Sequence, residues 1–152
     1  MAELKDRLRA DLNDAMRARD QVRMRTLRMA LTSITNEEVA GASARDLSDD
    51  EIIKVLTREA RKRREAAEAF GAAGRSEQAA AERAEEDVLA DYLPAQLGED
   101  ELAELVAAAI AETGATGMKS MGQVMKTVTP QVAGRADGAR VAAEVRRQLG
   151  SG

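Results

Sequence analysis

The sequence predicts an all-α protein, and two observations carry that prediction. Phe70 and Tyr92 are the only aromatic residues, so the core has to be built from Leu, Ile, Val, Met and Ala, a set that favours helices over strands here. Apolar residues also recur at helical spacing along most of the chain. A length of 152 residues, with 44% apolar and 33% charged residues, fits one or two soluble domains.

The N-terminal segment shows a helical pattern with one interruption. Leu4, Leu8 and Leu12 recur at helical spacing, and the pattern resumes after Asp20 and continues to Ile34. Two helices, or one helix broken near Asp20, fit this pattern.

A third helix is expected after a capping-box signal. Ser48 and Glu51 have the spacing of a capping box, and the apolar pattern that follows runs towards Phe70. Gly71 and Gly74 should stop this helix.

The best domain boundary lies just after a fourth helix. Ser76 is expected to open that helix, which ends at Tyr92-Leu93-Pro94. Pro94 and Gly98 interrupt the periodicity, which restarts among acidic residues suited to a helix N-terminus. We therefore expect an N-terminal domain at 1–93, a linker at 94–98 and a small C-terminal domain at 99–149.

Three helices are expected in the C-terminal domain. The periodic segments span 102–110, 121–128 and 141–149, and Gly114 ends the first of them. A tight segment at 134–138 separates the last two, where a glycine suits a left-handed C-cap. Asp137 is more simply explained as an N-cap than as a ligand contact.

Methionines in this domain have two interpretations. Met118, Met121 and Met125 follow helical spacing, which fits core packing better than an adaptable partner surface.

Composition argues against most enzyme classes. The chain has no Cys and no His, which removes the usual thiolate and imidazole ligands, nucleophiles and bases. Adjacent carboxylates at 37–38, 49–50 and 85–87 point in different directions on a helix, so capping and solubility explain them better than catalysis or magnesium binding. We expect no catalytic residues, no metal and no cofactor. The absence of a signal-peptide pattern or a long apolar run favours a cytoplasmic protein with no membrane partner.

Basic clusters leave two interpretations open. One cluster spans 17–28 and another spans 58–64, although the whole chain has a net charge of -4. Clustered cations bind phosphates, whereas helices in soluble proteins often carry a solvated face of paired charges, as Glu59 and Arg63 would form. Paired charges are the simpler explanation for both clusters. Scarce aromatics also argue against base stacking, so an RNA contact would read phosphates, 2′-hydroxyls or shape.

Several stretches resemble the YqeY proteins, whose C-terminal part is similar to the tail domain of GatB, a subunit of the glutamine-dependent tRNA amidotransferase. The similarity extends over essentially the whole chain. The stretches that carry it are AMRARDQVRMRTLRMALTSITNEEV, LSDDEIIKVL, FGAAGRSEQAAAERAEEDVLADYLPAQL, MGQVMKTV and GRADGARVAAEVRRQL.

The resemblance implies a four-helix N-terminal domain followed by a three-helix C-terminal domain that docks on tRNA. By similarity, the candidate nucleic-acid contacts are Lys119, Lys126, Arg135 and Arg140. This chain departs from the family pattern at Gln123 and Gln131, where lysine is expected, and each lost cation should weaken a phosphate contact.

Three functions follow as hypotheses. The first is a non-catalytic tRNA-docking or adaptor protein, partnered by tRNA or a tRNA-handling enzyme. The second is an accessory component of a glutamine-dependent tRNA amidotransferase, a carbon-nitrogen ligase with glutamine as amido-N-donor. Without Cys, His or an amidase signature, the chain is not expected to perform that reaction alone. The third is a helical protein-protein adaptor with no RNA contact.

Overall fold

The structure is a computed structural model that describes residues 3–132 and 134–150. Within these residues the chain forms seven α-helices, one short 3-10 helix and no strand. The predicted all-α class is therefore confirmed. The chain divides after Leu93 into two compact units, which we call the N-terminal unit and the C-terminal unit.

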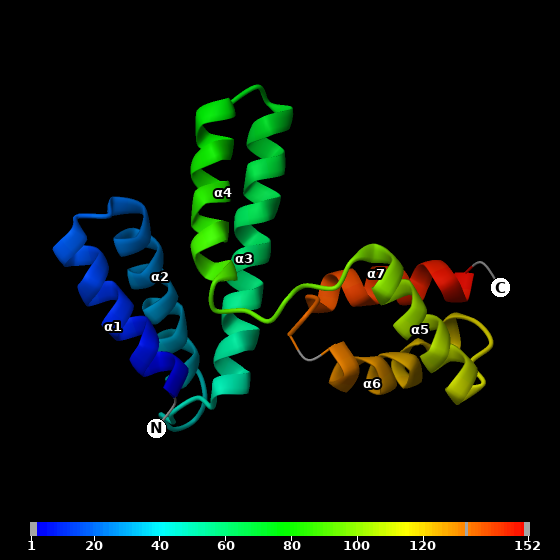
Figure 1. Cartoon of the computed structure of the whole chain (residues 1–152). Coiled ribbons are helices and arrows are strands. Elements are labelled where there is room, and N and C mark those ends of the chain that lie inside the picture. The colour runs from blue at the N-terminus through cyan, green and yellow to red at the C-terminus, as the bar shows by residue number, and fades with distance from the viewer. Residues whose placement is uncertain (1–2, 133, 151–152) are drawn as a thin grey trace. The chain divides into compact units, whose positions relative to one another are not determined.

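The N-terminal unit contains two helical hairpins. It consists of α1 (Glu3–Ala18), α2 (Gln21–Glu38), α3 (Asp49–Ala72) and α4 (Ser76–Ala90). The α1–α2 hairpin packs beside the α3–α4 hairpin, whose far end extends past it (Figure 1). The core of this unit is aliphatic apart from one tyrosine, and its buried residues are Leu8, Leu27, Ala30, Ile34, Leu47, Ile52, Val55, Leu56, Ala60, Val88, Leu89 and Tyr92.

The first segment forms two helices rather than one broken helix. Arg19 has a φ of 56°, in the left-handed region, and so turns the chain between α1 and α2. Asp20 then caps α2, because its side chain accepts a hydrogen bond from the Arg23 amide at 3.1 Å.

The ends of α3 confirm one prediction and correct another. Ser48 and Glu51 form the predicted capping box. Gly71 lies inside α3, which continues to Ala72, and the turn occurs at Gly74 with a φ of 76°. Only Gly74 adopts the left-handed conformation that ends the hairpin arm, so the prediction for Gly71 was wrong.

The fourth helix begins and ends close to the predicted positions. Ser76 is its first helical residue, and Arg75 holds the cap position without a side-chain hydrogen bond. Helix α4 ends at Ala90, just before the predicted end at 92–94.

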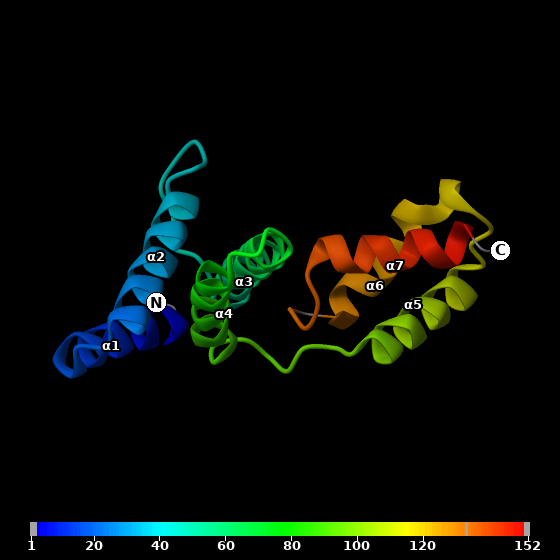
Figure 2. The same cartoon turned by 90° about the horizontal axis from the view of Figure 1, so that it is seen from above.

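The C-terminal unit is a small helical bundle. It consists of α5 (Glu99–Thr113), the 3-10 helix η1 (Met118–Ser120), α6 (Met121–Val132) and α7 (Gly138–Gly150). The three α-helices gather around one core, and Figure 2 shows them from above. Its buried residues are Leu97, Leu102, Val106, Ala109, Val124, Val128, Val132, Ala136, Val141, Val145 and Leu149.

Glycines set the turns of this unit. Gly114 ends α5 with a φ of 67°, as predicted, and Gly134 has a φ of 81° in the α6–α7 turn. The short η1 helix was not predicted, and it follows Gly117, whose φ is 108°. These turns determine the positions of Lys119, which follows Gly117, and of Arg135, which follows Gly134.

Candidate nucleic-acid interface

The four candidate contacts lie on consecutive parts of the C-terminal unit. Lys119 is in η1, Lys126 is in α6, Arg135 is in the α6–α7 turn and Arg140 is in the first turn of α7. Helices α6 and α7 pack on each other and both contact η1. The fold therefore brings the elements that carry these residues together, but the four side chains differ in what they already bind.

Lys119 is exposed and unpaired. Gly117 leads the chain into η1, where the Ser120 amide donates to the Gly117 carbonyl at 3.0 Å. Within the described residues, Lys119 forms no side-chain hydrogen bond or ion pair. Its ammonium group is therefore available to an anion.

Lys126 is exposed because of its position in the helical repeat of α6. Val124, Val128 and Val132 are buried in the core, so Lys126 falls on the outer side of α6. Its ammonium group has no hydrogen bond or ion pair to any residue in the described ranges. Gln123 and Gln131, where the resemblance predicts lysine, are also exposed on this helix.

Arg135 is engaged within its own unit. Its Nε donates to the Ala95 carbonyl at 3.3 Å, and its Nη2 lies 3.6 Å from Glu101 Oε2. Its backbone carbonyl accepts a hydrogen bond from the Leu97 amide at 2.8 Å. Of the four candidates, only Arg135 has side-chain partners among the described residues.

Asp137 positions the backbone of Arg140. The Arg140 amide donates to Asp137 Oδ1 at 3.0 Å, and the Val141 amide donates to the Asp137 carbonyl at 3.1 Å. Asp137 is thus an N-cap, as predicted. The Arg140 side chain is half-buried and has no ion pair within the part of the chain that the structure describes.

The acids of this unit lie on α5, on α7 and in the α6–α7 turn. Glu99, Asp100 and Glu101 occupy the first turn of α5, where the helix dipole favours negative charge. Glu144 pairs with Arg147 at 2.9 Å, and this hydrogen bond lowers the pKa of the Glu144 carboxyl. No acid lies on η1 or α6 to neutralise Lys119 and Lys126 by a local pair.

The methionines divide between the two interpretations. Met121 and Met125 pack against the core of the unit, whereas Met118 is 49% exposed beside Lys119. Core packing therefore describes two of the three.

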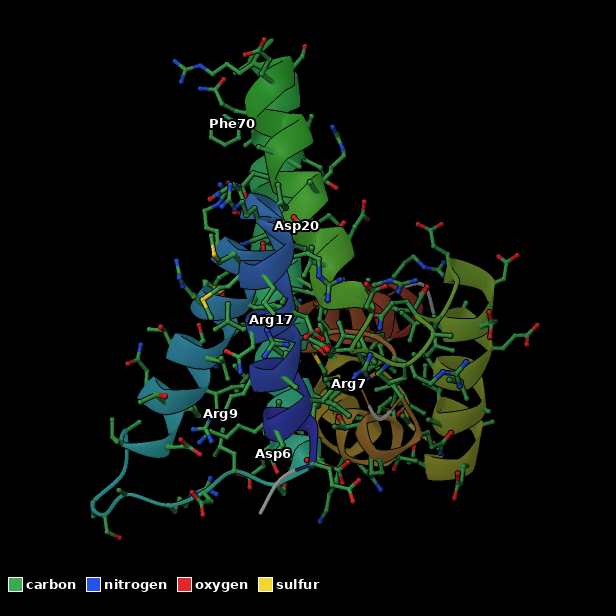
Figure 3. All side chains as sticks on the ribbon, turned by 60° about the vertical axis from the view of Figure 1, so that its left-hand side comes forward. Asp6, Arg7, Arg9, Arg17, Asp20 and Phe70 are labelled. Atoms are coloured by element: carbon green, nitrogen blue, oxygen red, sulfur yellow. The ribbon has the colours of Figure 1, made fainter. Side chains whose placement is uncertain are left out.

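The first basic cluster of the N-terminal unit is largely paired. Arg17 binds Asp14 at 3.2 Å, and Arg25 binds Glu85 on α4 at 2.9 Å. Arg17 lies on α1 and Asp20 at the corner between α1 and α2 in Figure 3, where Phe70 marks the far end of the α3–α4 hairpin. Most of this surface is thus a face of paired charges.

The second basic cluster is largely paired, although no ion pair is found for Arg61 among the described residues. Arg63 contacts Glu59 at 3.1 Å and Glu85 at 3.4 Å, and Arg64 contacts Glu86 at 3.4 Å. Lys62 contacts the same Glu59 carboxylate at 3.4 Å. The Glu59–Arg63 pair is the one that the sequence suggested.

Most of the adjacent carboxylates also have structural partners. Glu38 accepts from Lys5 Nζ at 2.8 Å, which lowers the pKa of the Glu38 carboxyl, and Glu37 lies 3.5 Å from Arg58. Asp49 accepts a hydrogen bond from the Leu4 amide at 3.1 Å. No group of three or more acidic side chains within the described ranges is placed to hold a metal ion.

One polar cluster had no signal in the sequence. Tyr92 donates its hydroxyl hydrogen to Asp11 Oδ2 at 2.5 Å, and the Arg7 guanidinium lies 4.5 Å from the centre of its ring. Burial raises the pKa of the Tyr92 phenol, and the hydrogen bond to Asp11 adds to the shift. The cluster joins α1 to the segment just after α4. It therefore connects residues that lie far apart in the sequence.

None of the described helices combines the length and apolar character needed to cross a membrane.

Comparison with known proteins identifies the family of this chain. The family described as Yqey-like protein matches residues 5–149 of this chain. The chain is also 33% identical over 150 residues to the altered inheritance of mitochondria protein 41, mitochondrial, of Pyrenophora tritici-repentis. That alignment covers 95% of this chain and 80% of the relative.

Proposed function

Because the chain belongs to the YqeY-like family, we propose that it is a non-catalytic docking protein whose C-terminal unit binds tRNA. The observation that carries the proposal is the pair Lys119 and Lys126. Both are exposed and unpaired within the described ranges, and they lie on adjoining elements of the unit that resembles the GatB tail.

The chemistry of this surface favours the RNA backbone over the bases. Free ammonium groups neutralise phosphates and release counterions, which gives salt-dependent binding. The C-terminal unit has no aromatic residue, so it has no stacking platform for an unpaired base. Such a surface recognises phosphates, 2′-hydroxyls or overall shape.

Matched charge reversals in the full chain test this proposal. We would titrate labelled tRNA with the native chain, with Lys119→Glu/Lys126→Glu and with the control Lys54→Glu/Arg83→Glu. Lys54 and Arg83 are exposed and have no ion pair in the described part of the N-terminal unit. The control therefore changes the net charge equally.

The native chain should bind, with an affinity that falls steeply between about 50 and about 200 mM salt. The reversal of Lys119 and Lys126 should abolish binding, while the control should retain most of it. No binding by the native chain at the lower salt concentration would refute direct tRNA recognition.

A second candidate function is an accessory component of a glutamine-dependent tRNA amidotransferase. It is favoured by the similarity of the C-terminal part to the GatB tail, and in this proposal the chemistry belongs to other subunits. In this case the chain should co-purify with amidotransferase subunits and change their rate of tRNA amidation. A reconstituted amidotransferase that neither binds nor responds to the chain would exclude this function.

A third candidate, a protein-protein adaptor, is favoured by Met118. This side chain is 49% exposed next to a free lysine, which suits an apolar contact with an acidic rim. The adaptor function predicts that Met118→Asp abolishes partner binding while RNA titration gives no signal.

We also propose that the two compact units are independent domains. Tyr92 and Leu93 pack with the N-terminal core, whereas Leu97 packs with the C-terminal core. A fragment ending at Leu93 should therefore keep its helices and unfold cooperatively, as circular dichroism would measure. A fragment without a cooperative transition would contradict independent folding.

A further inference from the structure

Residues 95–97 are fastened to the α6–α7 turn, and we call them the strap. The Leu97 amide donates to the Arg135 carbonyl at 2.8 Å, and Gln96 Nε2 donates to the Gly134 carbonyl at 3.2 Å. Arg135 Nε donates in the opposite direction, to the Ala95 carbonyl at 3.3 Å. Three successive strap residues are therefore bonded to two successive turn residues.

The Arg135 guanidinium also reaches the start of α5. Its Nη2 lies 3.6 Å from Glu101 Oε2, while Glu101 Oε1 accepts a hydrogen bond from the Gly98 amide at 3.5 Å. The same arginine thus bridges the strap and the first turn of α5.

Buried neighbours hold both sides of this bridge. Leu97 is 3% exposed and Ala136 is 5% exposed, and both belong to the core of the C-terminal unit. Arg135 therefore directly precedes the buried residue Ala136, and the strap that it contacts contains the buried residue Leu97.

A phosphate at this position would have to compete with existing partners. It would approach the Glu101 carboxylate, whose charge has the same sign, and it would displace the hydrogen bond to Ala95. A phosphate that binds Lys119 or Lys126 displaces no partner, because neither side chain has one in the described ranges.

We infer that Arg135 is a positioning residue of the RNA-docking surface and makes no phosphate contact itself. Its guanidinium holds the strap and the start of α5 against the α6–α7 turn. It thereby fixes the turn that joins two helices: α6, which carries Lys126 in its middle, and α7, which carries Arg140 in its first turn. We call this set of Arg135 contacts the brace. The brace rests on the contacts alone, whereas its role in docking rests on the proposed function.

Three full-length variants and one comparator separate the two roles. Arg135→Ala removes the brace and the charge, Arg135→Lys keeps the charge, and Gln96→Ala loosens the strap without changing the charge. Lys126→Ala is the comparator that removes a free cation. Lysine cannot replace the arginine, because a single ammonium on a flexible stem does not reproduce the planar fork of a guanidinium.

The first readout is hydrogen exchange at the Leu97 amide. Loss of one charge-assisted hydrogen bond at a partly exposed site should speed this exchange by roughly threefold to tenfold in Arg135→Ala and Arg135→Lys. Gln96→Ala should also speed it, whereas Lys126→Ala should leave it unchanged. Unchanged exchange in both Arg135 variants would overturn the brace, whether or not tRNA binds.

The second readout is the salt dependence of tRNA affinity. The Arg135 and Gln96 variants should lose affinity without a change in the slope of log affinity against log salt. Lys126→Ala should reduce that slope by about 0.7 to 0.9.

A normal affinity in Arg135→Lys, together with a reduced slope in Arg135→Ala, would identify a direct phosphate contact and overturn the positioning role. If the native chain binds no tRNA, the proposed function and the docking role fail together, and the exchange readout still decides the brace.

Discussion

The two units carry similar net charges but use their cations differently. The N-terminal unit has 17 Lys and Arg against 20 Asp and Glu, and the C-terminal unit has 6 against 7. In the first, arginines bridge helices, as Arg25 and Arg63 both do by binding Glu85. In the second, Lys119 and Lys126 have no partner in the described ranges.

The N-terminal unit also has exposed cations without an ion pair in the described ranges, such as Lys54 and Arg83, but acids lie on the same helices. The C-terminal unit differs because η1 and α6, which carry Lys119 and Lys126, have no acid.

The largest effect is expected from the buried carboxylate Glu59. It is 6% exposed and accepts hydrogen bonds from Ser33 at 3.1 Å, Lys62 at 3.4 Å and Arg63 at 3.1 Å. Glu59→Ala removes the acceptor of all three donors, while Arg63 keeps its contact with Glu85 at 3.4 Å, so the free energy of unfolding should fall by about 3 kcal/mol, or about 1 kcal/mol per hydrogen bond.

Urea unfolding followed by Tyr92 fluorescence measures this loss, because the only tyrosine lies in the N-terminal unit. Glu65→Ala removes an exposed acid from the same helix and should stay within about 0.5 kcal/mol of the native chain. Equal effects of the two substitutions would show that the network adds no stability.

A smaller loss is expected from Tyr92→Phe. The substitution removes the hydroxyl that donates to Asp11, and a hydrogen bond to a charged group contributes about 1.5–3 kcal/mol. Urea unfolding followed by circular dichroism measures this loss.

The phenol of Tyr92 gives an independent check. Because its pKa is raised, the associated stability is present below the ordinary value of 10.0 and is lost as the pH rises above it. Ultraviolet absorbance of the folded native chain should therefore show little tyrosinate at pH 10.0. Half-ionisation at that pH would contradict the buried hydrogen bond.

A smaller loss of stability is expected in the C-terminal unit when the cap of α7 is removed. Asp137→Ala removes the acceptor of the Arg140 amide and should cost about 1 kcal/mol. Hydrogen exchange of the first amides of α7 reports the change. Asp100→Ala removes an exposed acid of the same charge from α5 and should cost only a few tenths of a kcal/mol. A larger effect at Asp100 would contradict the capping role.

The smallest effect concerns the exposed pair Arg45 and Glu51. Hydrogen bonds from Arg45 and from the Ser48 amide lower the pKa of Glu51 from 4.5 to about 2. The stability that Glu51 contributes is therefore present above pH 4.5 and lost as the pH falls towards 2. Arg45→Ala should make thermal stability less sensitive to acid across this window, although solvent screening keeps the difference small. Unchanged acid sensitivity, with Arg83→Ala as the control, would assign the shift to Ser48 alone.

Helix caps and apolar periods could be predicted because they depend on neighbours in sequence. Ser48, Gly114 and Asp137 have the expected capping roles. The end of α3 was misplaced because both Gly71 and Gly74 are stop signals locally, and packing of α3 on α4 carries the helix past the first.

Contacts between distant residues carry no such local signal. By resemblance Arg135 is a candidate phosphate contact, and only the fold shows that the Ala95 carbonyl and the Glu101 carboxylate are its partners. The Tyr92–Asp11 hydrogen bond likewise joins residues 81 positions apart. The sequence therefore identifies candidate cations, and the structure separates the free ones from those already bound.

The most direct test of this separation is lysine acetylation of the full chain with and without tRNA, read by mass spectrometry. Lys119 and Lys126 should be protected by tRNA, while Lys54, which is also exposed and unpaired within the described ranges, should be acetylated equally in both samples. Protection of Lys54 with continued acetylation of Lys119 and Lys126 would place the RNA on the N-terminal unit and contradict the proposed docking surface.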